Sequence, residues 1–198
     1  MRLFKPLICL FITPFLANCF FLPLPISESK FQERIDNLES HTYSKAVVTY
    51  KNNITGTGVL EENADKSSGE ITYNYDYSYQ KWTTSSTDSH ATEYSFVLYS
   101  IKGSKITSSS YDEDIPQVSI KQTYYDNPLK FSVKRTGDFL QNGISFKINE
   151  TTTYTFNKYG YCTKATYKCD DKINGSLGSG VTVSGTQKGN QTITVSFK

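Results

Sequence analysis

The sequence predicts a mainly β protein: a curved antiparallel sheet, half-barrel or sandwich-like, with one N-terminal amphipathic helix. Two observations predict this fold. Apolar residues recur convincingly at helical spacing only over residues 28–40, and beyond that segment apolar and polar residues alternate with period two almost everywhere, as in half-buried strands. Polar connections rich in Ser, Thr, Gly and Asp separate the alternating segments, so sequential antiparallel pairing is the simplest arrangement.

The predicted helix spans residues 28–40. Its apolar face consists of Phe31, Ile35 and Leu38. Ser29 with Gln32 three residues later forms a capping-box pattern at the start, which satisfies the free backbone N–H groups of a helix N-terminus. This helix is expected to pack its apolar face against the sheet.

The strands are expected to follow in order along the chain. The first hairpin would join residues 46–50 to residues 54–60 through the turn-forming pair Asn52-Asn53. The further predicted strands are 71–82, 93–101, 117–125, 129–135 and 144–156, then 161–169 after a turn at 157–160, and a last hairpin of 181–185 with 192–197. The polar segments between them, including residues 170–180, are expected to be surface loops.

The first eighteen residues have the pattern of an export signal. Arg2 and Lys5 precede an apolar run from Leu7 to Leu16, which is the cationic region and hydrophobic region of such signals. Residues 1–18 are therefore predicted to be an export signal, and the rest of the chain is predicted to be extracytoplasmic.

The segment Leu16-Ala17-Asn18-Cys19 resembles the bacterial lipobox, in which the Cys is lipidated and becomes the mature N-terminus. The resemblance implies that Cys19 is the lipid attachment site and that the protein lies at the cell membrane, on its extracytoplasmic face. Two alternatives stay open: ordinary cleavage nearby, which gives a secreted protein, and no cleavage, which leaves residues 7–26 as a membrane anchor. Residues 19–27 would form an apolar tether, and residues 28–198 a single β-rich domain.

Charge argues against nucleic acid as a partner. The chain has 21 Lys+Arg and 19 Asp+Glu, and Arg2 and Lys5 lie in the signal, so residues 19–198 carry 19 of each. A neutral body with interspersed charges creates no field that would attract a polyanion.

Two cysteines, Cys162 and Cys169, remain for the domain itself. If residues 161–169 form one regular strand, the two side chains lie on opposite faces, about 23 Å apart, which is too far for a disulfide. Free thiols are expected, with Cys169 on the apolar face.

No catalytic constellation is recognisable. His41 and His90 are isolated in the sequence and belong to no metal-spaced cluster, and no G-x-S-x-G occurs. We therefore predict a protein that is not an enzyme, with no catalytic residues, no metal site and no cofactor.

The strongest internal signal is a row of four tyrosines. Tyr73, Tyr75, Tyr77 and Tyr79 would share one face of a strand. Their rings cover apolar area while their hydroxyls need partners or water. One interpretation is a ligand-facing wall, completed by Phe96 and Leu98; the other is that the row simply packs under the helix, since Tyr is favoured in strands.

The order and size of these elements resemble those of the LolA/LppX-like envelope lipoprotein carriers. The segment Thr153 to Tyr161 is similar to a strand-turn-strand in which such lipoproteins carry an F-[ND]-x-x-G turn. The resemblance implies a half-barrel sheet around an apolar cavity for acyl chains. We expect a membrane-anchored lipoprotein that binds a hydrophobic or glycan-bearing ligand; the alternative is a structural or adhesive surface module that binds another protein.

Overall fold

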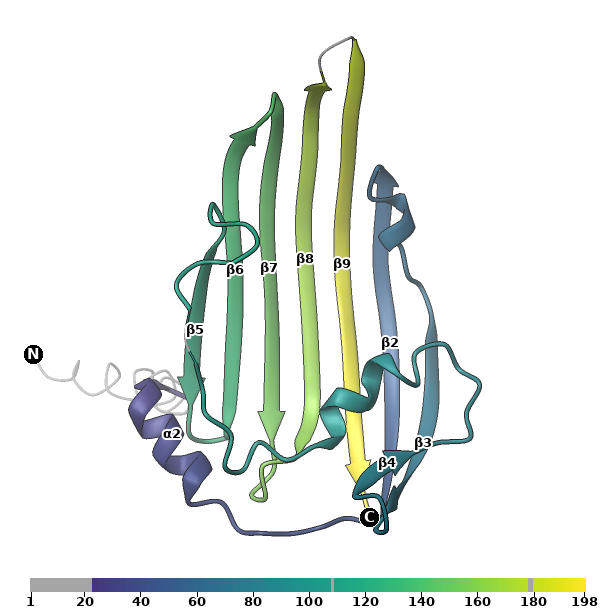
Figure 1. Cartoon of the computed structure of the whole chain (residues 1–198), viewed down its shortest axis with the longest axis vertical. Coiled ribbons are helices and arrows are strands. Elements are labelled where there is room, and N and C mark those ends of the chain that lie inside the picture. Colours follow the sequence, from purple (N-terminus) through teal and green to yellow (C-terminus); the bar gives the residue numbers. More distant parts are fainter. Residues whose placement is uncertain (1–22, 108, 178–179) are drawn as a thin grey trace, which may run out of the picture.

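The computed structural model describes residues 23–107, 109–177 and 180–198. It confirms the mainly β fold, with one open antiparallel sheet of nine strands in the order β1-β5-β6-β7-β8-β9-β2-β3-β4 (Figure 1). The elements in chain order are β1 (Pro25–Ile26), α2 (Glu28–Asp36), β2 (Lys45–Gly58), η1 (Glu61–Asn63), β3 (Ser68–Asp76), β4 (Lys81–Thr83), η2 (Glu93–Leu98), β5 (Ser119–Tyr125), β6 (Lys130–Gln141), β7 (Ile144–Phe156), β8 (Cys162–Leu177) and β9 (Val181–Phe197); η1 and η2 are 3-10 helices.

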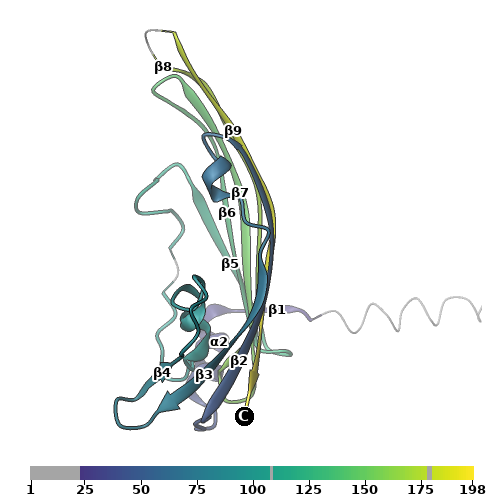
Figure 2. The same ribbon diagram turned by 90° about the vertical axis from the view of Figure 1, so that its right-hand side faces the viewer.

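The sheet is curved along its length, and α2, η1 and η2 lie on its concave side (Figure 2). Strands β5 to β9 follow one another as a meander, as sequential pairing predicts. The N-terminal strands β2, β3 and β4 then join at the far side of β9, because β2 pairs with β9 along nearly its whole length. β9 therefore connects the two parts of the sheet.

The helix α2 is present but shorter than residues 28–40. Ser27 caps it by accepting a hydrogen bond from the backbone N–H of Lys30, so the predicted capping box at Ser29 was wrong. The helix ends where the backbone N–H and the side chain of Asn37 both donate to the carbonyl of Glu33. Phe31 and Ile35 are fully buried against β5, as their spacing predicts.

Two predicted hairpins were wrong. The segment predicted to turn at Asn52-Asn53 is the single long strand β2, and the segment predicted to turn at residues 187–190 is the single long strand β9. The expected turn at Asn52-Asn53 does not form because the Asn52 side chain is buried, and its amide donates to Asp65 and to the Tyr94 hydroxyl. The neighbouring backbone then continues along β9, with Asn53 opposite Asn190. Residues 170–177, expected in a loop, extend β8 in the same way.

The predicted turn at residues 157–160 forms between β7 and β8. Asn157 accepts hydrogen bonds from the backbone N–H groups of Tyr159 and Tyr161, and Gly160 has a φ of 80°, which favours glycine. A change of register beside Phe156 follows. Because this bulge adds one residue, Cys162 faces the core together with Cys169, so the prediction of opposite faces was wrong; both are buried, free thiols.

Two hydrophobic clusters occupy the lower half of the sheet, which we define as the half nearest α2 and η2 in Figure 1. One cluster lies between η2 and strands β2, β3, β8 and β9, and the other lies between α2 and β5. The upper half, towards the β6–β7 and β8–β9 turns, is a single layer of strands flanked by η1 and by the loop of residues 109–118 (Figures 1 and 2). Both clusters therefore lie at one end of the sheet, whereas in the upper half Val118 of that loop is buried beside Gly137 of β6.

Candidate functional site

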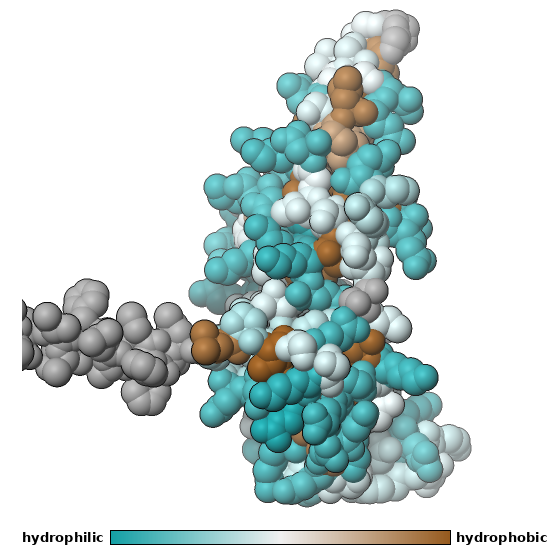
Figure 3. Space-filling model, turned by 90° about the vertical axis from the view of Figure 1, so that its left-hand side faces the viewer, coloured by the Kyte–Doolittle hydropathy of each residue, from teal (hydrophilic) through white to brown (hydrophobic). Residues whose placement is uncertain are grey.

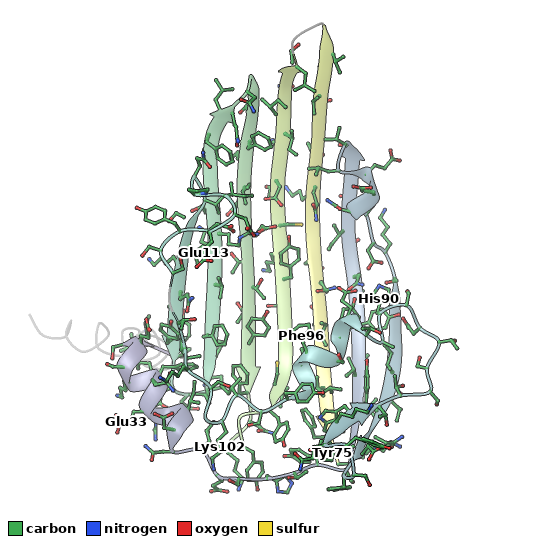
Figure 4. The ribbon with its side chains drawn as sticks, in the orientation of Figure 1. Glu33, Tyr75, His90, Phe96, Lys102 and Glu113 are labelled. Atoms are coloured by element: carbon green, nitrogen blue, oxygen red, sulfur yellow. The ribbon has the colours of Figure 1, made fainter. Side chains whose placement is uncertain are left out.

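The short helix η2 forms the roof of the candidate site. Residues 93–101 were predicted to be a strand, which was wrong. Tyr94, Val97 and Leu98 recur at helical spacing and are buried against the sheet, so the 3-10 turns point all three inward at once. Phe96 points another way and is 50% exposed, in front of the central strands (Figure 4).

Two small apolar hollows lie between η2 and the concave face of the sheet. The first has a volume of ≈ 140 Å³ and the second of ≈ 160 Å³. The first is lined by Phe96, Val97, Tyr99, Ile101, Phe131, Tyr154, Phe156 and Cys162. The second is lined by Phe96, Thr152, Tyr154, Ala165, Thr166, Tyr167, Gln191 and Ile193. Phe96 and Tyr154 line both hollows, and their rings meet edge to face with centroids 6.3 Å apart.

The lining of the first hollow is mostly aromatic and is uncharged at neutral pH. The ring of Phe131 lies 5.1 Å from that of Tyr154 and 5.8 Å from that of Phe156, centroid to centroid. Burial raises the pKa of Tyr154, and it raises the pKa of the Cys162 thiol to about 11. The phenol and the thiol therefore stay protonated, which suits an apolar group rather than an ion.

A polar band lies beside the second hollow. The Tyr167 hydroxyl donates to Glu150 at 2.7 Å, and the Arg135 guanidinium pairs with both Glu150 and Asp112. Burial and the hydrogen bond to Glu150 raise the pKa of Tyr167. Tyr167 lines the second hollow, so its hydroxyl, which is bonded to Glu150, is the nearest group of this band to a ligand there.

A polar cluster fixes the chain segment that leads into η2. The two ring nitrogens of His90 lie 3.1 Å from Asp88 and 3.2 Å from Asp65, and Tyr50 donates to Asp88 at 2.6 Å. Burial opposes a charge on His90, but the hydrogen bonds and charges of Asp88 and Asp65 outweigh it and raise the pKa of the imidazole. The His90 ring also stacks on that of Tyr94, with centroids 5.1 Å apart, so this cluster holds η2 in place.

The structure separates the four tyrosines that were predicted to share one strand. The expected strand over residues 71–82 is correct for residues 71–76 in β3 and for residues 81–82 in β4, but it is not continuous. β3 ends at Asp76, whose side chain accepts the N–H groups of Ser78 and Tyr79 in a turn. Tyr73 is buried in the core and donates to the carbonyl of Ala91 at 2.6 Å.

The other tyrosines of the row lie away from the hollows. Tyr75 packs on Trp82 at the edge of the core, and Tyr77 and Tyr79 are 62% and 74% exposed. Of the six predicted ligand-binding residues, Phe96 alone lines the hollows, whereas Leu98 is buried in the core.

Sequence reasoning missed Tyr154 and Tyr167, which carry much of the lining. Their signal was present: in β7 and β8 they alternate with polar neighbours on either side of the turn at residues 157–160. The shared site of the two tyrosines becomes visible only when β7 and β8 are paired in register, because that pairing places Tyr154 opposite Ala165 and Thr152 opposite Tyr167.

The predicted export signal and the predicted lipid attachment at Cys19 lie outside the described residues. Residues 19–27 were predicted to form an apolar tether. Near the end of this segment, Pro25 and Ile26 instead form β1 and pair with β5. In the described ranges, no helix has the length and apolar character to cross a membrane. The same ranges bring together no group of His, Cys, Asp and Glu side chains that could hold a metal ion.

No protein-family model, curated protein or solved structure matches this chain.

Proposed function

We propose that this protein is a membrane-anchored extracytoplasmic lipoprotein that binds a hydrophobic or glycan-bearing ligand and is not an enzyme. The observation that carries the proposal is the pair of hollows beneath η2, which share Phe96 and Tyr154. Pockets for small molecules are concave and mostly apolar, with a few polar groups that orient the ligand. The two hollows and the band at Glu150 and Tyr167 have that composition.

The volumes of the hollows limit the ligand to a small one. Each is close to the roughly 150 Å³ of an engineered cavity in another protein that binds benzene. One ring or a short stretch of one chain fills each hollow. A sugar or hydroxyl-bearing head would then lie beside Glu150 and Tyr167, at the end that opens towards the upper half of the sheet.

The anchor in this proposal is a lipid on Cys19. The start of the domain supports it, because β1 follows Cys19 by a few residues and is itself the edge strand of the sheet, paired with β5. A lipid on Cys19 would hold the sheet close to the extracytoplasmic face of the cell membrane.

A second candidate function is a surface module that binds another protein. The specific observation in its favour is the upper half of the sheet, which neither α2 nor η2 covers (Figures 1 and 2), and whose strand register places apolar residues such as Phe139, Phe146 and Ile173 on the concave side. Apolar sheet faces of this kind mark interaction sites.

The test measures binding of a fluorescent fatty acid and of octyl glucoside to the full chain. Phe96→Ala removes the ring common to both hollows and should weaken binding roughly tenfold or more, since burial of a Phe side chain contributes about 1.5–3 kcal/mol. The control Tyr77→Ala removes an exposed ring from the predicted tyrosine row and should leave binding unchanged. Loss of binding in Tyr77→Ala but not in Phe96→Ala would place the ligand on the tyrosines instead.

Native mass spectrometry of the protein from its own membrane completes this test. It should give a mature N-terminus at Cys19 with added acyl mass, together with any retained ligand. A mature chain that begins at another residue, or an unmodified Cys19, would contradict the anchor and leave the ligand site to be judged by the Phe96→Ala result.

A further inference from the structure

The concave face of the upper half has an apolar floor. Alternation along the strands and their register place one set of partly exposed apolar side chains on this face: Phe139, Ile144, Phe146, Ile148, Ile173 and Val183. The opposite face of the same strands carries Asp138, Ser145, Lys147, Lys172, Asn174 and Ser184. Figure 3 views the sheet from its β5 side and shows hydrophobic residues at the surface of this upper half. Such a division between faces is typical of a sheet that packs against a second layer.

The dimensions of this floor fit an α-helix. The distance from β6 to β9 is about 14 Å at about 4.8 Å per strand spacing, and a helix with its side chains is about 10–12 Å wide. From Ile144 to Ile148 the floor is about 14 Å long, which matches a helix of roughly nine residues. A single acyl chain is much narrower and would leave most of the floor in contact with water.

The surroundings of the floor are acidic. The loop of residues 109–118 on one side contains Asp112, Glu113 and Asp114, and η1 on the other side contains Glu61 and Glu62; Glu113 is labelled in Figure 4. Below the floor lie Glu150 and Asp171.

Basic side chains are scarce around the floor. Among the described residues of that loop, of η1 and of the concave positions of β6 to β9, Arg135 is the single basic residue, and it is already paired with Asp112 and Glu150. An occupant with positive charges beside an apolar face complements this surface, whereas an anionic lipid surface does not.

We infer that the upper concave face binds a basic amphipathic helix of another protein, with its apolar side on the floor and its Lys or Arg side chains towards the acidic rims. The bound helix supplies the second layer that α2 and η2 supply in the lower half. This inference deepens the second candidate function and is independent of the ligand in the hollows.

The experiment uses the full chain in phosphatidylcholine nanodiscs, with binding to empty nanodiscs subtracted. The probe is a synthetic 18-residue peptide, designed with leucines on one helical face and lysines on the rest, and its control has glutamates in place of the lysines. The lysine peptide should bind at least about ten times more tightly, and its affinity should fall steeply as salt is raised, because salt screens exposed charges. Equal binding of the two peptides, or no binding of the lysine peptide, would overturn the inference.

Variants locate the peptide on the floor. Phe146→Ser should weaken binding about tenfold, whereas Leu140→Ser, a similar truncation of an exposed side chain on the opposite face, should not change it. Glu113→Lys should weaken binding and reduce its dependence on salt, with Glu70→Lys on the other side of the sheet as control.

Three further outcomes separate this site from the rivals. Phe96→Ala should leave peptide binding intact, so the inference and the proposed ligand site can fail separately. Circular dichroism establishes that each variant is folded. If sedimentation instead finds a dimer that Phe146→Ser dissociates, a second copy of the chain covers the floor and the inference is wrong.

Discussion

The lower and upper halves of this sheet are built from the same long strands but are stabilised differently. In the lower half the strands have a second layer, since Phe31 and Ile35 of α2 and Tyr94 of η2 are fully buried on them. In the upper half the strands rely mainly on backbone pairing and on cross-strand contacts such as the stacked rings of Phe139 and Phe146, 5.1 Å apart, and Val118 of the loop of residues 109–118 adds a buried contact beside Gly137 of β6. The comparison indicates that the lower half holds the fold together and that the upper half is a surface available for binding.

The largest expected difference in the free energy of unfolding is between substitutions of Tyr73 and Tyr77, which the sequence predicted to lie in one row. Tyr73→Ala should lower the free energy of unfolding by about 3–5 kcal/mol, because it empties a core position and leaves the carbonyl of Ala91 without its hydrogen bond. Tyr77→Ala, in the exposed turn, should change it by less than about 0.5 kcal/mol. Urea denaturation measures both values. Similar losses in the two variants would mean that the turn after β3 is part of the core.

A smaller effect is expected from pH at the cluster that holds η2. The pKa of His90 is raised in the folded state, so the stability that its protonation contributes is fully present below the unfolded pKa of about 6.5 and is lost as the pH rises through the folded value. The loss is of the order of 1 kcal/mol for one partly buried charged pair.

Melting temperatures measured across this range test that prediction. The melting temperature of the unmodified chain should fall as the pH rises, and the fall should be much smaller in His90→Gln. If the melting temperature of His90→Gln keeps the full dependence on pH, the dependence arises from another titratable group.

The smallest effect is expected in the upper half. Phe146→Ala should cost less than about 1 kcal/mol, because the side chain is partly exposed and no second layer contacts it. Amide hydrogen exchange should agree, with upper amides such as those of β7 near Phe146 exchanging faster than those of Val48 and Val195 in the lower core. Equal protection in both halves would show that the single layer is as stable as the double one.

The fold class could be predicted from the sequence because alternation with period two marks strands wherever one face is buried. The same alternation cannot tell a hairpin from one long strand, and this is why β2 was divided at Asn52-Asn53 and β9 at residues 187–190. What decides between them is tertiary: a partner for the buried Asn52 amide in Asp65, and a continuous neighbour in β9. Asn142-Gly143, both with positive φ, closes the β6–β7 hairpin, as this dipeptide favours.

The candidate site was predictable only at Phe96. Residues 93–101 fit both periods, since Tyr94, Phe96 and Leu98 alternate while Tyr94, Val97 and Leu98 have helical spacing, and packing against the sheet selected the helix. The tyrosine row failed for a different reason. The Asp76 side chain ends β3 by accepting hydrogen bonds from two backbone N–H groups. These bonds compete with strand pairing, and the alternation of the tyrosines gives no sign of them.

The position of β9 has a consequence for how the protein reaches its native state. This strand leaves the ribosome after all other described strands, yet it lies between β8 and β2 and is the link between the two parts of the sheet. Until it is available, β8 and β2 are both open edges, and the contact of Val48 with Val195 closes a loop of most of the domain. Such long-range pairing is slow. Before it forms, the unpaired edges of β8 and β2 can pair with strands of other chains, which leads to aggregation. The complete sheet of this domain therefore cannot form before β9 has been made.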